Sequence, residues 1–286
     1  MHLEASCYIC HMASIDFSDP FTERTPRVVQ AAKLHRSAAR KKAQKFIVEG
    51  ENSVEAALAT GSATDLFISE QAAGRFSHIL TLARNMGVYV HPISERAAVH
   101  MADTKSTTGL FAICSPVLWP LKQALRGNPQ LLSIPVETNE PGNAGTLIRV
   151  ADAMGADAVV FAGETVDPQS SKCVRASAGS LFHLPVAREP NIEAVLQSVR
   201  ARGLQVLATS ADGEVNLDDA DELLAKRTAW LFGNEAHGLG EELLAKADHR
   251  VRIPIRGRAE SLNLATAASI CLYASSKMQH AGSSKS

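Results

Sequence analysis

The feature that most constrains the fold is a series of short, nearly continuous apolar runs that alternates with helical patterns after residue 130. Runs of this length and continuity are typical of strands buried on both faces of a parallel sheet. The expected strands are Leu131–Val136, Ala158–Ala162, Leu204–Thr209, Ala229–Phe232 and Val251–Ile255. The stretch from Asn263 to about Gln279 lacks Gly and Pro and predicts a long final helix. This region is therefore expected to be an α/β domain with a parallel sheet.

A smaller α/β region is expected ahead of it. Its apolar runs are Phe46–Val48, Leu66–Ile68, Val88–Val90 and Leu110–Cys114. Pro116, Pro120, Gly127 and Pro129 then indicate a linker. A chain of 286 residues exceeds the size at which one core usually stops growing, about 250 residues. We expect an extension at 1–20, a small domain at 21–115, a linker at 116–130 and a larger domain at 131–286.

Positive charge is concentrated near the start of the small domain. Residues 21–50 contain eight basic and two acidic side chains, whereas the whole chain has 29 Lys and Arg against 30 Asp and Glu. The pattern over 27–45 predicts one helix that is basic on most of its surface, and Asn52 or Ser53 is expected to cap the helix after Gly50. Such a segment can bind phosphates through its local potential, although a solvated helical face fits the charges equally well.

Composition excludes several classes of protein. No apolar run reaches the roughly 18 residues that cross a bilayer, and residues 1–19 lack the features of a secretory signal, so a cytoplasmic protein without a membrane partner is expected. The five cysteines are widely spaced, which favours reduced thiols. Cys7-Tyr-Ile-Cys-His11 matches the spacing of haem attachment, but no second ligand set accompanies it and we interpret it as chance. No metal site is expected, because zinc would need two more suitably spaced ligands.

Three polar, glycine-containing segments follow predicted strands of the larger domain, where ligands of α/β sheets bind. The first is Asn139-Glu-Pro-Gly-Asn-Ala-Gly-Thr-Leu-Ile-Arg149, which enters a helix whose buried stripe leaves Arg149 to one side. The second is Leu231-Phe-Gly-Asn-Glu235, followed by His237. The third runs from Ile253-Pro-Ile to Ser261-Leu-Asn263, where Ser261 or Asn263 can also cap the last helix. These junctions are the expected site.

Familiar nucleotide and hydrolase motifs are missing from these segments. Gly142 and Gly145 do not complete a dinucleotide fingerprint, and no Walker lysine follows a glycine at the required spacing. The Gly-x-Ser-x-Gly elbow of serine hydrolases is absent. His237 is interpreted first as a turn residue and only second as a catalytic base. Dehydrogenase, P-loop kinase and serine hydrolase functions are therefore disfavoured.

Taken together and in this order, the three segments resemble the three motifs of the SpoU (TrmH-like) branch of the SPOUT methyltransferases, which methylate ribose 2′-hydroxyls in RNA. The small domain is similar to the ribosomal-protein-like substrate-binding module that many such enzymes carry. The residues behind that second likeness are Arg36, Arg40, Phe46, Val48, Glu49 and Gly50.

The resemblance implies a deep carboxyl-terminal trefoil knot, a homodimer with sites at the subunit interface, and S-adenosylmethionine as cofactor. By position, it implies that the cofactor contacts Thr209, Gly233, Ile253 and Leu262. It implies a catalytic set of Arg149, Asn143, Glu235, Ser261 and Asn263. The RNA-binding residues of the basic segment would be Arg27, Lys33, Arg36, Arg40, Lys41, Lys42 and Lys45.

The chemistry of methyl transfer also suggests roles. The reaction is an in-line displacement, so the site must align the ribose oxygen with the methyl group and exclude water. A guanidinium is always charged near neutrality, so Arg149 is expected to grip a phosphate and stabilise negative charge on the 2′-oxygen rather than take its proton. Glu235 would orient Arg149 or Asn143, while Ser261 and Asn263 would fix the ribose.

The expected function is therefore 2′-O-methylation of RNA, with ribosomal RNA of the 23S type as substrate. Transfer RNA is the alternative substrate, and a non-catalytic RNA-binding protein on the same scaffold is the alternative function. Base methylation is disfavoured, because Ser261-Leu-Asn263 resembles the ribose-modifying branch.

Overall fold

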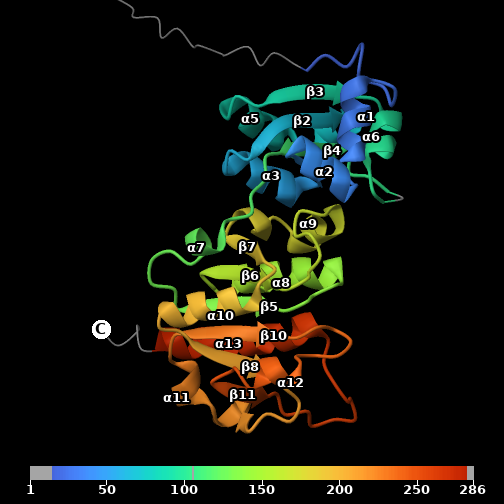
Figure 1. Ribbon diagram of the computed structural model, residues 1–286. Coiled ribbons are helices and arrows are strands. Elements are labelled where there is room, and N and C mark those ends of the chain that lie inside the picture. Colours follow the sequence, from blue (N-terminus) through green and yellow to red (C-terminus); the bar gives the residue numbers. More distant parts are fainter. Residues whose placement is uncertain (1–14, 105, 282–286) are drawn as a thin grey trace, which may run out of the picture.

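The computed structural model describes residues 15–104 and 106–281, which form two α/β units stacked end to end (Figure 1). The first unit has a four-stranded sheet of order β1-β4-β2-β3, in which β2 and β3 are parallel and the other pairs antiparallel. Its strands are β1 Phe46–Glu49, β2 Ala63–Ser69, β3 Tyr89–Ile93 and β4 Leu110–Cys114. Its helices are α1 Pro26–Lys33, α2 Ser37–Ala43, α3 Glu51–Ala59, α4 Glu70–Arg75, α5 Ser77–Asn85 and α6 Glu95–Met101.

The second unit has a seven-stranded sheet of order β7-β6-β5-β10-β8-β11-β9, and every neighbouring pair in it is parallel. Its strands are β5 Leu131–Pro135, β6 Ala158–Ala162, β7 Val186–Glu189, β8 Gln205–Thr209, β9 Val215–Asn216, β10 Thr228–Phe232 and β11 His249–Arg252. Its α-helices are α8 Pro141–Ala153, α9 Ser171–Ser177, α10 Ile192–Ala201, α11 Asp221–Leu224, α12 Glu241–Leu244 and α13 Leu264–Ala281, with 3-10 turns at Ser180–Phe182 (η1) and Leu217–Asp219 (η2). The predicted parallel sheet is confirmed.

The predicted strands and the actual ones differ in a few places. The fifth predicted strand, 251–255, is shifted: β11 ends at Arg252, and Pro254 lies in the loop after it. Strands β7 and β9 were not predicted. Strands β5, β6 and β10 are fully buried, as expected of strands covered on both faces.

The single basic helix predicted over 27–45 is wrong, because the chain breaks between α1 and α2. At the break, His35 Nε2 donates to Met101 O at 2.7 Å, and His35 Nδ1 lies 2.6 Å from Ser171 Oγ. Arg40 donates to the carbonyls of Leu34 and His35, which the break leaves outside a helix. The Arg40 side chain therefore satisfies two carbonyls that a continuous helix would otherwise have used, and the His35 ring fixes the break against remote residues. The predicted cap of α3 is also wrong, since Gly50 holds that position, with φ 92°.

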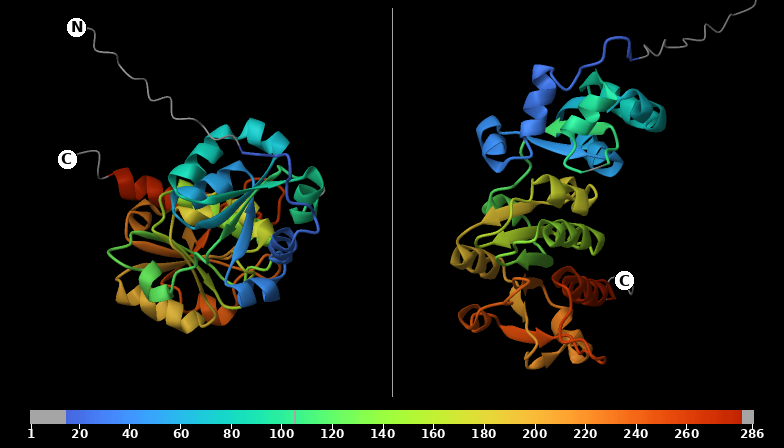
Figure 2. Two further views of the ribbon diagram at one scale, coloured as in Figure 1. Left: turned by 90° about the horizontal axis from the view of Figure 1, so that it is seen from above. Right: turned by 90° about the vertical axis from the view of Figure 1, so that its right-hand side faces the viewer.

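The two units share one apolar core. One face of the first sheet, with α3 and α5, is continuous with the face of the second sheet that α8, α9 and α13 cover. Phe46 of β1 stacks on Phe182 at 6.1 Å between ring centroids. Gly179 lies so close to α3 that a Cβ there would be 2.9 Å from Asn52 O. The right-hand view of Figure 2 shows the same stacked arrangement.

The segment predicted as a linker is packed rather than free. It contains α7 (Leu121–Ala124), and Trp119 N donates to Val186 O at 2.8 Å. Ala124 and Leu125 are buried against the second sheet. The segment therefore belongs structurally to the second unit.

The three described cysteines, Cys114, Cys173 and Cys271, are buried and free, and burial raises the pKa of each thiol. Within the described ranges, no helix is both long and apolar enough to cross a bilayer.

Candidate active site at the ends of three parallel strands

The first and second motifs are joined where β5 and β10 end side by side. Glu137 turns the chain out of β5 with φ 50°, a left-handed conformation that a non-glycine residue rarely adopts. The buried Asn234 donates its amide to Glu137 O at 2.6 Å. At the start of the second motif, a Cβ on Gly233 would lie 2.3 Å from the backbone carbon of Gly238, so only glycine fits there.

A chain of side-chain hydrogen bonds then links all three motifs. Asn143 Nδ2 donates to Glu235 Oε1 at 3.2 Å, and Asn263 Nδ2 donates to Asn143 Oδ1 at 3.1 Å. Within one chain, Glu235 bonds to Asn143, which is one of the two partners predicted for it. Asn263 also caps α13 through Oδ1, which accepts from Ala265 N at 2.9 Å, so the capping and site interpretations hold together. We call Glu235, Asn143 and Asn263 the pocket network.

The pocket network borders a cavity of about 480 Å³. A second cavity of about 170 Å³ adjoins it and shares Thr209, Ser261, Leu262 and Ala267 in its lining. Gly233 lines the first cavity and Ile253 the second. All four residues predicted to contact the cofactor therefore lie at these two cavities, whose combined size is in the range of small-molecule sites, about 300 to 1,000 Å³.

Arg149 is the one predicted catalytic residue that the fold does not bring to the cavity. It lies on α8 two turns beyond Asn143, is exposed, and makes no hydrogen bond or ion pair with any described residue. The cavities of a single chain thus contain four of the five predicted catalytic residues.

Glu140 and Lys172 form a polar contact that sequence reasoning missed. Glu140 caps α8 by accepting from Asn143 N at 2.9 Å, and its other carboxylate oxygen accepts from Lys172 Nζ. The hydrogen bond from Lys172 is the largest cause that holds the pKa of Glu140 below its ordinary value. Pro141 at the first helical position marks Glu140 as the cap of α8, and that local signal could have identified Glu140. No local pattern marks Lys172, because it is 32 residues away in sequence.

Most of the predicted RNA-binding residues are exposed, but Arg40 is not. Arg27, Lys33, Arg36, Lys41 and Lys42 are exposed, and Lys45 is half-buried. The side chain of Arg40 is only 7% exposed and donates through Nε and Nη2 to Asp167 Oδ2, at 2.9 and 2.7 Å. Arg40 is therefore wrong as an RNA contact: it joins the first unit to the second.

Other candidates from the sequence have no chemical partners that suggest a site. His237 is exposed, and its nearest carboxylate is that of Glu137, 3.7 Å away. Cys7 and Cys10 lie outside the described residues. In the described part of the chain, no cluster of three or more His, Cys, Asp or Glu side chains could hold a metal ion.

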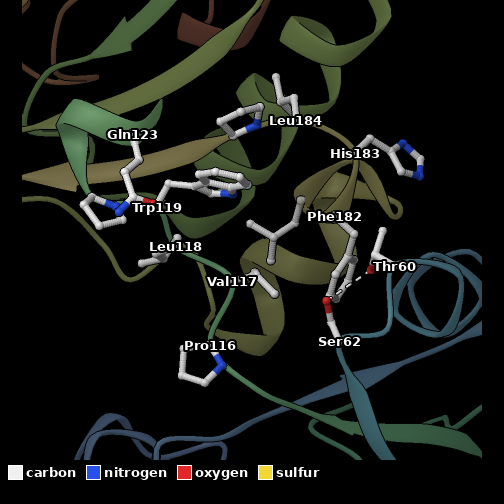
Figure 3. Close-up of a pocket in the computed structure, with 13 residues that line it drawn as sticks. Thr60, Ser62, Pro116, Val117, Leu118, Trp119, Gln123, Phe182, His183 and Leu184 are labelled. Atoms are coloured by element: carbon white, nitrogen blue, oxygen red, sulfur yellow. Dashed lines mark hydrogen bonds between the residues drawn. The ribbon is translucent and has the colours of Figure 1, made fainter. Parts of the chain in front are cut away.

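Another open groove lies at the junction between the two units (Figure 3). It measures about 500 Å³, and Trp119, Phe182 and Thr60 are among its lining residues. It contains no carboxylate, lysine or arginine and none of the predicted site residues. We therefore assign the site to the cavities at the three motifs, where polar groups converge.

Comparison with known proteins agrees with this geometry. Residues 131–273 match the model of the SpoU rRNA methylase family, and residues 25–112 match that of the MRM3-like substrate-binding domain. The chain is 32% identical over 251 residues to RlmP of Bacillus subtilis, a 23S rRNA (guanosine(2553)-2′-O)-methyltransferase, covering 87% of this chain and 96% of that protein.

Solved structures show the same likeness. An rRNA methyltransferase of Sinorhizobium meliloti with bound AdoMet has a TM-score of 0.77 and 32% identity, over 88% of this chain and 95% of that one. The SpoU methyltransferase AviRb of Streptomyces viridochromogenes, in complex with AdoMet, has a TM-score of 0.80 and 27% identity, over 90% of this chain and all of that one. From the matched motifs, their shared cavity and these relatives, we conclude that the chain belongs to the SpoU rRNA methylase family.

Proposed function

We propose that the chain transfers a methyl group from S-adenosylmethionine to a ribose 2′-hydroxyl of RNA, with 23S ribosomal RNA as its substrate. The observation that carries this proposal is the pocket network, which joins the three motifs beside a cavity of suitable size. The names of RlmP and AviRb, and the cofactor bound in the solved relatives, support the substrate class and the methyl donor.

The residues at the two cavities fit the cofactor. Ile253, Leu262 and Val251 offer apolar surface for a flat base, while Thr209 and the backbone around Gly233 offer polar groups. Gly233 packs directly against the backbone of Gly238 and Leu239, which holds the two ends of the loop at residues 233–239 close together. Bound there, S-adenosylmethionine would supply a methyl group on a positively charged sulfur.

The chain's own contribution is to position the ribose. Glu235 fixes the amide of Asn143, and Asn143 in turn fixes Asn263, so the orientation of both amides is set before RNA binds. Ser261 lines both cavities and makes no hydrogen bond with a described residue, so its hydroxyl is free to contact the sugar. Preorganised groups of this kind reduce the entropy lost on reaching the reactive geometry.

Arg149 requires a second copy of the chain. We propose that a homodimer forms and that Arg149 of one copy acts at the pocket of the other, where it grips a phosphate and stabilises charge on the 2′-oxygen. Its exposure on α8, outside the pocket of its own chain, supports this arrangement. Ile270 and Tyr273 support it too, because both are exposed on α13 at spacings of three from the pocket residue Ala267.

A carboxyl-terminal knot and a cytoplasmic location are also part of the proposal. After β11, the last strand in the sequence, the chain passes the pocket through residues 253–263. It then returns as α13 and packs on α8, β5 and β10. That return path is what a knotted segment would need. Ribosomal RNA, named as the substrate of the relatives, supports the cytoplasmic location.

The test is methyl transfer from labelled S-adenosylmethionine to ribosomal RNA, with the modified ribose mapped in RNA from cells with and without the protein. Arg149→Ala should lower the single-turnover rate by about 10²-fold or more, and Arg149→Lys should recover only part of it, because lysine keeps the charge but loses the fork. Near-wild-type turnover of Arg149→Ala would remove Arg149 from the mechanism. Cofactor binding without transfer to any RNA would favour a non-catalytic RNA-binding protein, and transfer to tRNA alone would replace the substrate.

A further inference from the structure

Two exposed cations, Arg36 and Lys172, lie beside a contact that joins the first unit to the second. The contact is made by His35, between α1 and α2, which we call the basic helices. His35 Nδ1 lies 2.6 Å from Ser171 Oγ, and Arg36 and Lys172 are the next residues along the two chain segments. Because consecutive Cα atoms are about 3.8 Å apart, both side chains start beside this one contact. Figure 1 shows α9, which carries Lys172, between α2 above and α8 below.

Lys172 also reaches the site. Its Nζ contacts one carboxylate oxygen of Glu140, and the other oxygen accepts from Asn143 N. Asn143 belongs to the pocket network. Two consecutive residues, Ser171 and Lys172, therefore connect the basic helices on one side with the ribose pocket on the other.

Four cations on the helix side of this connection have no anionic partner among the described residues. Lys33, Arg36, Lys41 and Lys42 are exposed and form no ion pair with a described residue. Lys172 has one partner, Glu140, and both side chains are largely exposed, at 59% and 42%. Exposed ion pairs contribute little to stability, so a phosphate can replace this carboxylate at small cost.

We propose that Lys172 is an RNA phosphate contact that guides the backbone from the basic helices across the junction to the ribose pocket, in exchange for its ion pair with Glu140. The proposal rests on the proposed function and adds a residue to it. RNA would then contact Lys41 and Lys42 at the end of α2, Arg36 before its start, and Lys172 on α9. The contact is with phosphate and does not read sequence.

The experiment measures RNA affinity of the full chain for a ribosomal RNA fragment at several salt concentrations, without cofactor. Lys172→Ala should weaken binding several-fold and reduce the slope of log K against log salt by about 1, as expected for one lost phosphate contact. Lys122→Ala is the matched control. Lys122 is exposed on α7, a helix that Figure 1 shows on the side of the second unit away from α9, and its replacement should leave both values unchanged.

Glu140→Gln separates phosphate binding from a purely structural role. The glutamine oxygen can still accept from Asn143 N, but the ion pair to Lys172 is lost. If Lys172 binds phosphate, this variant binds RNA as tightly as the wild type or more tightly. If Lys172 only holds Glu140 in place, both variants lower turnover at saturating RNA while affinity and salt slope stay the same, and the proposal is overturned.

Failure of the Lys172 proposal can be distinguished from failure of the proposed methyltransferase function. A wild-type chain that methylates ribosomal RNA while Lys172→Ala binds RNA with unchanged salt dependence refutes only the guiding contact. Absence of methyl transfer by the wild type refutes the function, whatever Lys172 does.

Discussion

Two polar networks on neighbouring elements differ sharply in burial. At the junction, Arg40 is buried and uses three nitrogens on Asp167 and on the carbonyls of Leu34 and His35. In the pocket network, Asn143, Glu235 and Asn263 are joined to one another by hydrogen bonds of 3.1 to 3.2 Å at an accessible cavity. We call the first set, Arg40 with Asp167, the junction network.

The difference shows how burial divides structural from functional polar groups. A buried charge must be fully paired, because removing it from water is costly, and so it cannot be released to a ligand. An exposed amide or carboxylate loses little when its partner changes, so it can exchange that partner for substrate. Arg40 and its neighbours Arg36, Lys41 and Lys42 all carry a positive charge. Only the difference in burial separates the structural role of Arg40 from the phosphate contacts proposed for the exposed three.

The largest effect should come from breaking the junction network. Arg40→Ala leaves Asp167 and two carbonyls without their donor, which should lower the free energy of unfolding by about 3 kcal/mol. Arg36→Ala, four residues away on exposed surface, should change it by less than about 0.5 kcal/mol. Urea denaturation measures both. Equal stability of the two variants would contradict the distinction drawn between buried and exposed cations.

Breaking the pocket network should lower methyl transfer strongly and the free energy of unfolding only slightly. Asn143→Ala removes the residue to which both Glu235 and Asn263 bond, and we expect methyl transfer to fall about 10²-fold. Its stability should change little, by about 0.5 kcal/mol, since the side chain lies at an open cavity. Single-turnover kinetics and urea denaturation together test this, with the exposed Asn128→Ala as control. A large loss of stability with unchanged turnover would reverse the assignment.

The smallest effect concerns His91, a buried histidine within the first unit. Its Nε2 lies 3.1 Å from both Asp65 Oδ1 and Arg27 Nη1, while Nδ1 has no partner. Burial is the main cause that lowers the pKa of His91 below its ordinary value of 6.5, although Asp65 acts in the opposite direction.

The sign of the pH effect follows from this shift. In the unfolded chain His91 binds a proton as the pH falls below 6.5, whereas in the folded chain it does so only at lower pH. The stability that depends on a neutral His91 is therefore complete above pH 6.5 and is lost as the pH falls through the folded pKa. His91→Phe keeps the ring contacts with Phe21 and Phe67 but cannot titrate. Its unfolding free energy should therefore fall less between pH 7 and pH 5. An identical pH dependence in both proteins would show that His91 does not carry the effect.

Much of the fold and most of the site were predictable because their signals are local. Buried strands such as 158–162 and 110–114 are continuous apolar runs, and their bounds agree with the structure. Parallel strands end at the same edge of a sheet, so polar segments that follow them were expected to meet, as Asn143, Glu235 and Asn263 do. The helix break at His35 was not predictable, because its partners Met101 and Ser171 are remote in sequence.

The sequence by itself determined the parallel sheet, the three motifs and their order, because side-chain pattern and backbone-permissive glycines act over a few residues. Only the tertiary structure decided that Glu235 pairs with Asn143, that Arg40 is buried against Asp167, and that Lys172 reaches Glu140. These contacts join residues that are 32 to 127 positions apart. Their energies depend on distance and burial, which exist only once the strands and helices have packed into the folded units.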